Sequence, residues 1–203
     1  MIVVGLAGRA GSGKSAVAQM LVRRPGVAWI DLDELAWATY APGTQGFAEA
    51  VRRFGRTVVA ADGTIDRRAL GRIVFSDDAA RDDLERIVYP ALEARWKSVA
   101  EEHRAAGTRV LLVEGAAIAT SRHVDRSGFD LILWLDAPLD ERRARLREVD
   151  REGHADRGRE PSWSCDEWGR RTKLIRIDAC GTVDDVAARV WAAIERRSEP
   201  DRR

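Results

Sequence analysis

The sequence predicts an α/β protein in which an open, mostly parallel sheet of five strands is covered by helices on both sides. The chain opens with a short β-branched run, residues 2–7, which stops at glycines and is followed by a helical pattern at 15–22. Two later apolar runs, 109–113 and 131–135, are typical of parallel strands buried on both faces. Helical patterns separate the strands, as parallel connections require.

The remaining elements follow in chain order. Residues 27–30 predict the second strand, 60–64 a turn, and 174–177 a weaker fifth strand. Residues 66–103 show a mostly helical pattern that is rich in charge. We expect this pattern to break at Tyr89-Pro90, because proline removes a backbone donor and disfavours helix in the residue before it.

The length predicts one domain. A chain of 203 residues with 45% hydrophobic content can bury a full core as a single domain over residues 1–203. Within it we expect a helical, acceptor-binding insert at 34–105. The charged segment 147–172, which contains Gly153, Gly158 and Pro161, is a candidate lid.

Charge and cysteine usage exclude several classes of partner. The formal charge is +1, from 34 basic and 33 acidic residues mixed along the chain, so we expect neither a nucleic acid nor a membrane as partner. We expect no secretory leader, and no apolar run approaches the roughly 20 residues that span a bilayer. Cys165 and Cys180 are isolated, which favours a reducing cytoplasm. His103, His123 and His154 show no metal-ligand spacing and are expected at the surface or in turns.

Residues 8–15, Gly-Arg-Ala-Gly-Ser-Gly-Lys-Ser, match the P-loop pattern G-x-x-x-x-G-K-[ST] between a predicted strand and a predicted helix. They therefore predict a three-layer P-loop NTPase fold with ATP as the expected nucleotide, although the loop alone does not distinguish a kinase from a GTPase or an ATP-driven switch. Lys14 would neutralise the β and γ oxygens as a catalytic group, and the Ser15 hydroxyl would bind Mg²⁺. The nucleotide-binding set is expected to comprise Gly8, Ala10, Gly11, Ser12, Gly13, Lys14, Ser15 and Ala16.

The alternative for this loop is a glycine-rich turn that binds nothing. The flanking strand and helix weigh against it, and so does the scarcity of lysine. Only Lys14, Lys97 and Lys173 are lysines, so a lysine inside the loop suggests a need for its compact ammonium group.

Three acidic residues follow predicted strands. We expect Asp31 and Asp33 at the carboxyl end of the second strand, with Asp33 as general base and Asp31 as its supporting partner. Alternatively one of them caps a helix that starts near Glu34. Glu114 follows the strand at 110–113 and is predicted to hold a water of the magnesium shell and to line the substrate site; its alternative is an exposed strand-end acid.

Arginines follow the fourth strand, and at least one should screen the charge of the transferring phosphoryl group. Arg142, Arg143, Arg145 and Arg147 are the candidates. Arg143 and Arg147 are four residues apart and share a helix face, so they are the predicted catalytic pair.

Beyond the P-loop, which many families share, the chain resembles the dephospho-CoA kinase family over most of its length. The resemblance lies in Gly11-Ser12-Gly13-Lys14-Ser15, in Ile30-Asp31-Leu32-Asp33, and in the order of Ala41-Pro42-Gly43, Arg53-Phe54-Gly55, residues 61–70, Val74-Phe75 and Tyr89-Pro90. It implies ATP-dependent phosphorylation of the ribose 3′-hydroxyl of dephospho-CoA. Asp33 matches the family's proposed base, and Arg67 and Arg68 lie in the acceptor-binding insert.

Two positions depart from that family. Tyr89, a predicted substrate contact, stands where the family usually has histidine before proline, and Val113-Glu114-Gly115 looks more like uridine kinases. One alternative function is therefore a divergent kinase that phosphorylates a nucleoside, a nucleotide or another hydroxyl metabolite. Another is an NTP-binding switch without an acceptor, which would need neither Asp33 nor a lid.

Overall fold

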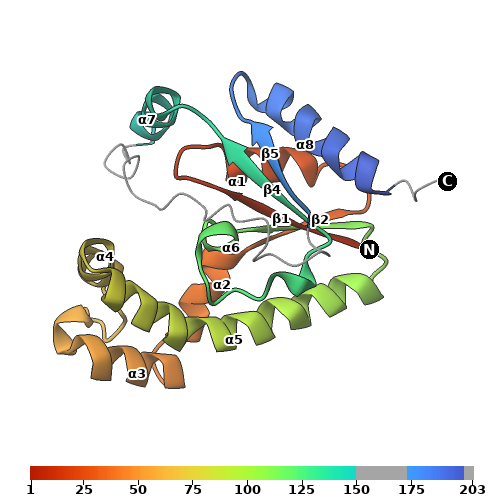
Figure 1. Cartoon of the computed structure of the whole chain (residues 1–203). Coiled ribbons are helices and arrows are strands. Elements are labelled where there is room, and N and C mark those ends of the chain that lie inside the picture. Colours follow the sequence, from red (N-terminus) through yellow and green to blue (C-terminus); the bar gives the residue numbers. More distant parts are fainter. Residues whose placement is uncertain (150–172, 199–203) are drawn as a thin grey trace. The chain divides into compact units, whose positions relative to one another are not determined.

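The computed structural model describes residues 1–149 and 173–198 (Figure 1). Its elements are β1 (Ile2–Gly8), α1 (Lys14–Leu21), β2 (Val27–Asp31), α2 (Leu32–Thr39), α3 (Gln45–Phe54), η1 (Arg56–Val58), α4 (Arg67–Ser76), α5 (Asp78–Ala105), β3 (Val110–Glu114), α6 (Ala117–Thr120), η2 (Arg126–Gly128), β4 (Leu131–Asp136), α7 (Leu139–Arg147), β5 (Lys173–Asp178) and α8 (Val183–Ser198). The five strands form one parallel sheet in the order β2-β3-β1-β4-β5. This confirms the predicted α/β class and sheet.

The chain divides into two compact units. The first comprises Met1–Asp31, Ala100–Ser121 and Asp125–Arg203, of which the structure describes 125–149 and 173–198. The second comprises Leu32–Val99 and Arg122–Val124. The insert predicted at 34–105 overlaps the second unit, and its acceptor-binding role stays a prediction. The predicted lid at 147–172 lies outside the described residues except for its first three.

In the first unit both faces of the sheet are buried, which explains why its central strands read as continuous apolar runs. Helices α1 and α8 lie along one face of the sheet (Figure 1), and alternate side chains of that face, such as Leu6 and Leu133, belong to the core formed with them. On the other face, a Cβ added at Gly5 would come within 3.1 Å of the Ile118 side chain on α6. Glycine at this position therefore lets α6 approach the middle of the sheet closely.

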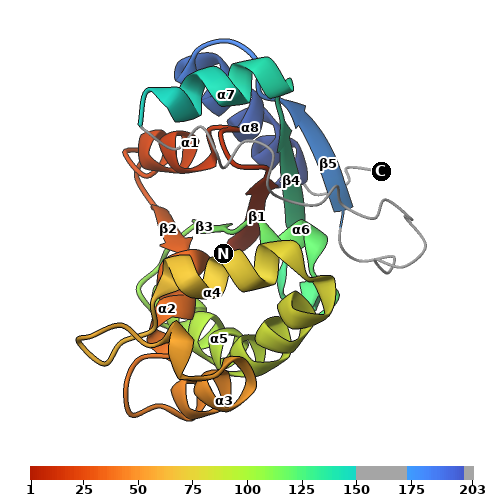
Figure 2. The same ribbon diagram turned by 90° about the vertical axis from the view of Figure 1, so that its left-hand side faces the viewer.

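The second unit has a small core of its own. Its buried side chains come from α3, η1, α4 and the start of α5: Ala50, Phe54, Val58, Ile65, Leu70, Val74 and Ala80. Figure 2 shows that the helices of this unit, α2 to α5, lie close together. Side chains cap three of them: Thr44 accepts from Phe47 N at the start of α3, Asp66 accepts from two amides at the start of α4, and Asp77 accepts from two amides at the start of α5.

The prediction that the helical pattern breaks at Tyr89-Pro90 is wrong. Helix α5 runs for 28 residues with Pro90 in its interior. Val88, Leu92 and Trp96 recur at four-residue intervals and are buried, whereas Pro90 is exposed. Burial of this apolar stripe offsets the hydrogen bond that proline removes. Within residues 1–149 and 173–198, no helix combines the length and the apolar character needed to cross a bilayer.

Candidate functional site

The predicted P-loop joins the end of β1 to the start of α1, with its glycines in backbone conformations that other residues rarely adopt. Gly11 has φ 79° and Gly13, at the N-cap of α1, has φ 88°. A Cβ added at Gly11 would lie 2.6 Å from the carbonyl oxygen of Arg142. The loop therefore needs glycine both for its turn and for close packing against α7.

Two polar side chains lie inside this loop. Lys14 Nζ donates to the carbonyl oxygens of Gly8 at 2.9 Å and of Arg9 at 3.1 Å, so its ammonium group lies over the loop backbone. Ser12 is 1% exposed, and its Oγ has no hydrogen-bond partner among the described residues. A buried hydroxyl without a hydrogen-bond partner indicates a place for a polar ligand. The loop thus fits a phosphate chain at the N-terminus of α1.

A hydrogen bond between a serine hydroxyl and a buried glutamate lies beside the loop. Ser15 Oγ donates to Glu114 Oε1 at 2.6 Å, and Glu114 is 5% exposed at the end of β3. Asp31, the last residue of β2, is aligned with Glu114 in the sheet register. Hydroxyl and carboxylate oxygens grouped in this way are the ligands that Mg²⁺ prefers, directly or through water. The donor set therefore fits a magnesium ion.

The two aspartates of the second strand are separated by an element boundary. Strand β2 ends at Asp31, and α2 begins at Leu32, so Asp31 stands where the capping alternative places the capping residue, with Glu34 three residues later. Asp33 consequently lies in the first turn of α2, where a carboxylate also interacts favourably with the helix dipole. Its role as general base stays a prediction.

Helix α7 brings two arginines to the P-loop that the sequence reasoning did not choose. Arg142 is 2% exposed; its Nη1 donates to the carbonyl oxygen of Ala10 at 3.3 Å, and its Nε donates to that of Ala137 at 3.2 Å. Arg145 Nη1 donates to the carbonyl oxygen of Gly11 at 3.5 Å, and its Nη2 donates to that of Ala179 at 2.8 Å. Both guanidinium groups thus anchor backbone around the loop.

Arg143 and Arg147 are exposed on α7, and their catalytic role stays a prediction. The signal for Arg142 is its spacing from Leu146, a buried residue one turn further along α7. A helix with so few apolar residues gives little indication of its inward face, so the spacing argument chose a pair on the exposed side.

In the second unit, α4 begins at Arg67 behind the capping Asp66, and the Arg67 guanidinium lies 3.7 Å from the ring centroid of Trp37. Burial raises the pKa of Tyr40; the positive charge of Arg67 opposes that shift and the negative charge of Asp33 adds to it. Arg67, Tyr40 and Asp33 therefore share one neighbourhood. The sequence reasoning named neither Trp37 nor Tyr40.

Two other predicted substrate contacts lie in this unit. Arg68 follows Arg67 in the first turn of α4 and is exposed. Tyr89 lies within α5 and is half-buried. Their roles stay predictions.

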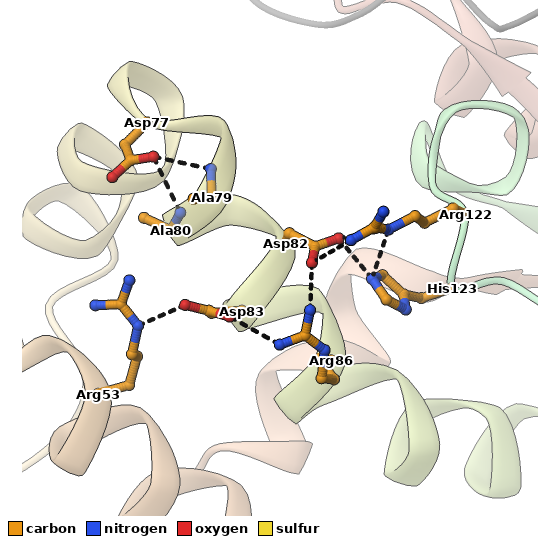
Figure 3. Close-up of polar contacts among 9 residues, drawn as sticks. All are labelled: Arg53, Asp77, Ala79, Ala80, Asp82, Asp83, Arg86, Arg122 and His123. Atoms are coloured by element: carbon orange, nitrogen blue, oxygen red, sulfur yellow. Dashed lines mark hydrogen bonds and ion pairs between the residues drawn. The ribbon is translucent and has the colours of Figure 1, made fainter.

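The second unit also holds a charged cluster around Asp82 (Figure 3). Asp82, Glu85 and His123 bring metal-ligand atoms within 4.8 Å of one another, and Figure 3 draws Asp82 and His123 of this group. However, the Asp82 carboxylate already accepts from Arg86, from Arg122 and from His123 Nε2 at 2.7 Å. Two guanidinium groups on one carboxylate oppose a cation there. The cluster acts as a tie that holds residues 122–124 to α5.

The partners of Asp82 in this cluster lower the pKa of its carboxyl group. Hydrogen bonds from Arg122 and then from His123 lower the pKa of Asp82 to about 2. His123 comes from a segment about 40 positions away in sequence, so no local spacing indicates this contact.

The comparisons with known proteins agree along most of the chain. The family model described as dephospho-CoA kinase matches residues 2–158. A dephospho-CoA kinase of Symbiobacterium thermophilum is 39% identical over 197 residues, covering 95% of this chain and 80% of that protein. One of Geobacter sulfurreducens is 32% identical over 195 residues, covering 95% of this chain and 98% of that protein.

Two solved structures resemble the fold. The crystal structure of TT1252 from Thermus thermophilus has a TM-score of 0.69 and 28% identity and covers 98% of both chains. A dephospho-CoA kinase from Campylobacter jejuni has a TM-score of 0.52, covers 96% of both chains and is 16% identical, so it supports the fold alone.

Proposed function

The chain belongs to the dephospho-CoA kinase family, whose members are phosphotransferases, and we propose that it transfers the γ-phosphoryl group of ATP to the ribose 3′-hydroxyl of dephospho-CoA. The observation that carries this proposal is the extent of the family match. It runs from the P-loop through the whole of Leu32–Val99, the part of the chain that a generic nucleotide-binding protein would not share.

The first unit carries the residues for the phosphoryl donor. Backbone amides of the P-loop and the N-terminus of α1 bind the phosphates, and Lys14 exchanges its loop carbonyls for phosphate oxygens. Ser15 and Glu114 hold Mg²⁺, which when bound neutralises charge on the phosphate oxygens. Arg142 keeps the loop in shape through its contact with Ala10. On this assignment these residues contribute to catalysis by positioning the phosphates and neutralising their charge.

The second unit carries the residues for the acceptor. Asp33 accepts the proton of the attacking hydroxyl, and the charge of Arg67 in the same neighbourhood suits an anionic acceptor. On this assignment Asp33→Asn should lower kcat at least tenfold and leave ATP binding intact. An unchanged kcat would leave Asp33 with the dipole role that its place in the first turn of α2 already gives it.

The test is a panel of acceptors assayed for ADP release with ATP and Mg²⁺. We expect robust turnover with dephospho-CoA and little with nucleosides, nucleotides or other alcohols. Turnover that prefers another alcohol would reject dephospho-CoA as the substrate while retaining a kinase. Slow hydrolysis that no acceptor stimulates would favour the switch. An ATP-dependent enzyme of this kind also suits the cytoplasmic location that we propose for it.

A further inference from the structure

An exposed aromatic ring in the second unit holds a guanidinium group against its face. Trp37 on α2 is 40% exposed and is not part of the buried core of this unit. The Arg67 guanidinium, from α4, lies 3.7 Å from its ring centroid. This is well inside the roughly 6 Å over which a cation and an aromatic face attract each other. The contact therefore fixes the direction of a side chain that would otherwise sample many rotamers.

The charges around α4 distinguish Arg67 from its neighbours. Asp66 caps the helix, and Arg72 and Arg68 both lower the pKa of its carboxyl, after the hydrogen bond from Ala69 N as the largest cause. Arg67 instead acts on Tyr40, on the side where Asp33 also acts. Among the described residues Arg67 forms no ion pair with a carboxylate. Its guanidinium group, held over the Trp37 ring, is thus available to an anion from outside the chain.

We propose that Trp37 is a positioning residue for acceptor recognition: its ring holds Arg67 in place to bind the negatively charged diphosphate group of the acceptor. This rests on the proposed function. A guanidinium that is already ordered loses less side-chain freedom when it binds phosphate oxygens, so the ring improves acceptor affinity without touching the reacting atoms. Trp37 should therefore affect the KM for the acceptor and leave the chemical step alone.

The experiment compares steady-state kinetics of the wild type with Trp37→Ala, Trp37→Phe, Trp37→Leu, Arg67→Ala and the double variant Trp37→Ala/Arg67→Ala. For Trp37→Ala we expect an increase of about tenfold in the KM for dephospho-CoA, with kcat and the KM for ATP unchanged. Trp37→Phe should stay near the wild type because it keeps an aromatic face. The KM of the double variant for dephospho-CoA should be no higher than that of Arg67→Ala, because the ring acts only through the arginine.

Trp37→Leu separates positioning from packing. Leucine fills space without an aromatic face, so it should behave like Trp37→Ala if the ring positions Arg67 and like the wild type if Trp37 only packs. Arg72→Ala removes an exposed arginine of the same helix and should leave the acceptor KM unchanged. Additive losses in the double variant, or a wild-type KM in Trp37→Leu, would overturn the proposal. An inactive wild type with dephospho-CoA would instead reject the proposed function itself.

Discussion

Lys14 contributes the ammonium group of the phosphate loop, which donates to the carbonyl oxygens of Gly8 and Arg9. We expect Lys14→Ala to lower kcat/KM by a factor of at least about 100, equivalent to about 3 kcal/mol, because one donor to the phosphate oxygens is lost in the transition state. Steady-state kinetics with varied ATP measure this. Lys97→Ala is a matched control, since Lys97 pairs with Glu93 on the surface of α5. Equal activity of the two variants would remove Lys14 from the mechanism.

The contact between Ser15 and Glu114 makes a separate prediction about magnesium. Glu114→Gln keeps the size of the side chain and an oxygen that accepts from Ser15, but removes the negative charge. We therefore expect the Mg²⁺ concentration for half-maximal activity to rise about tenfold, as for the loss of one supporting ligand. A magnesium titration at saturating ATP measures it. Asp178→Asn changes a strand-end carboxylate on the edge strand β5 and should leave the Mg²⁺ concentration for half-maximal activity unchanged.

At this scale the sequence predicts the loop but not all of its surroundings. The P-loop residues are adjacent in sequence, so their spacing alone brings them together. Arg142 meets Ala10 across 132 positions, and nothing in the charged sequence of α7 indicates which arginine faces inward. Trp37 and Arg67 meet between two helices of the second unit, a packing outcome that no local pattern encodes.

Among the elements, those with strong periodicity or continuous apolar character were predictable from the sequence. The runs that predict β3 and β4 are buried on both faces of the sheet, and burial on both faces is what produces such runs. Proline misled the prediction for α5, because local propensity says nothing of the apolar stripe at Val88, Leu92 and Trp96 that stabilises the helix.

The continuity of α5 makes Pro90 a test of that explanation. Proline in a helix interior lacks an amide hydrogen bond and crowds the carbonyl one turn earlier. Because Pro90 is exposed, Pro90→Ala restores the bond without changing the core, and we expect the free energy of unfolding to rise by about 1–3 kcal/mol. Denaturant unfolding monitored by circular dichroism measures it. Glu102→Ala, a change to alanine at an exposed position of the same helix, serves as the comparison. A decrease for Pro90→Ala would show that the helix is shaped around its proline.

For the whole molecule, each unit carries its own set of residues with a proposed role. The phosphate loop and Glu114 belong to the first, and Asp33 and the pair of Trp37 with Arg67 belong to the second. Residues 122–124 also belong to the second unit, although the chain on either side of them belongs to the first. Hydrogen bonds from Arg122 and His123 to Asp82 hold this segment (Figure 3). The Asp82 tie thus lies within the second unit and holds a short segment that the chain enters at 121–122 and leaves at 124–125.

The tie should depend on pH in a direction that the Asp82 pKa fixes. That pKa is about 2 in the folded protein and 3.8 for an ordinary aspartate, so the charged carboxylate contributes stability above about pH 4 and loses it as pH falls toward 2. We expect Asp82→Asn to be less stable than the wild type near neutral pH and to lose that difference in acid. Asp83→Asn removes the same charge one residue away, where the carboxylate pairs with Arg53 and Arg86 instead. Hydrogen exchange distinguishes the two: only Asp82→Asn should speed exchange in 122–124, because only Asp82 holds that segment. Equal exchange in both variants would show that residues 122–124 keep their place without the carboxylate.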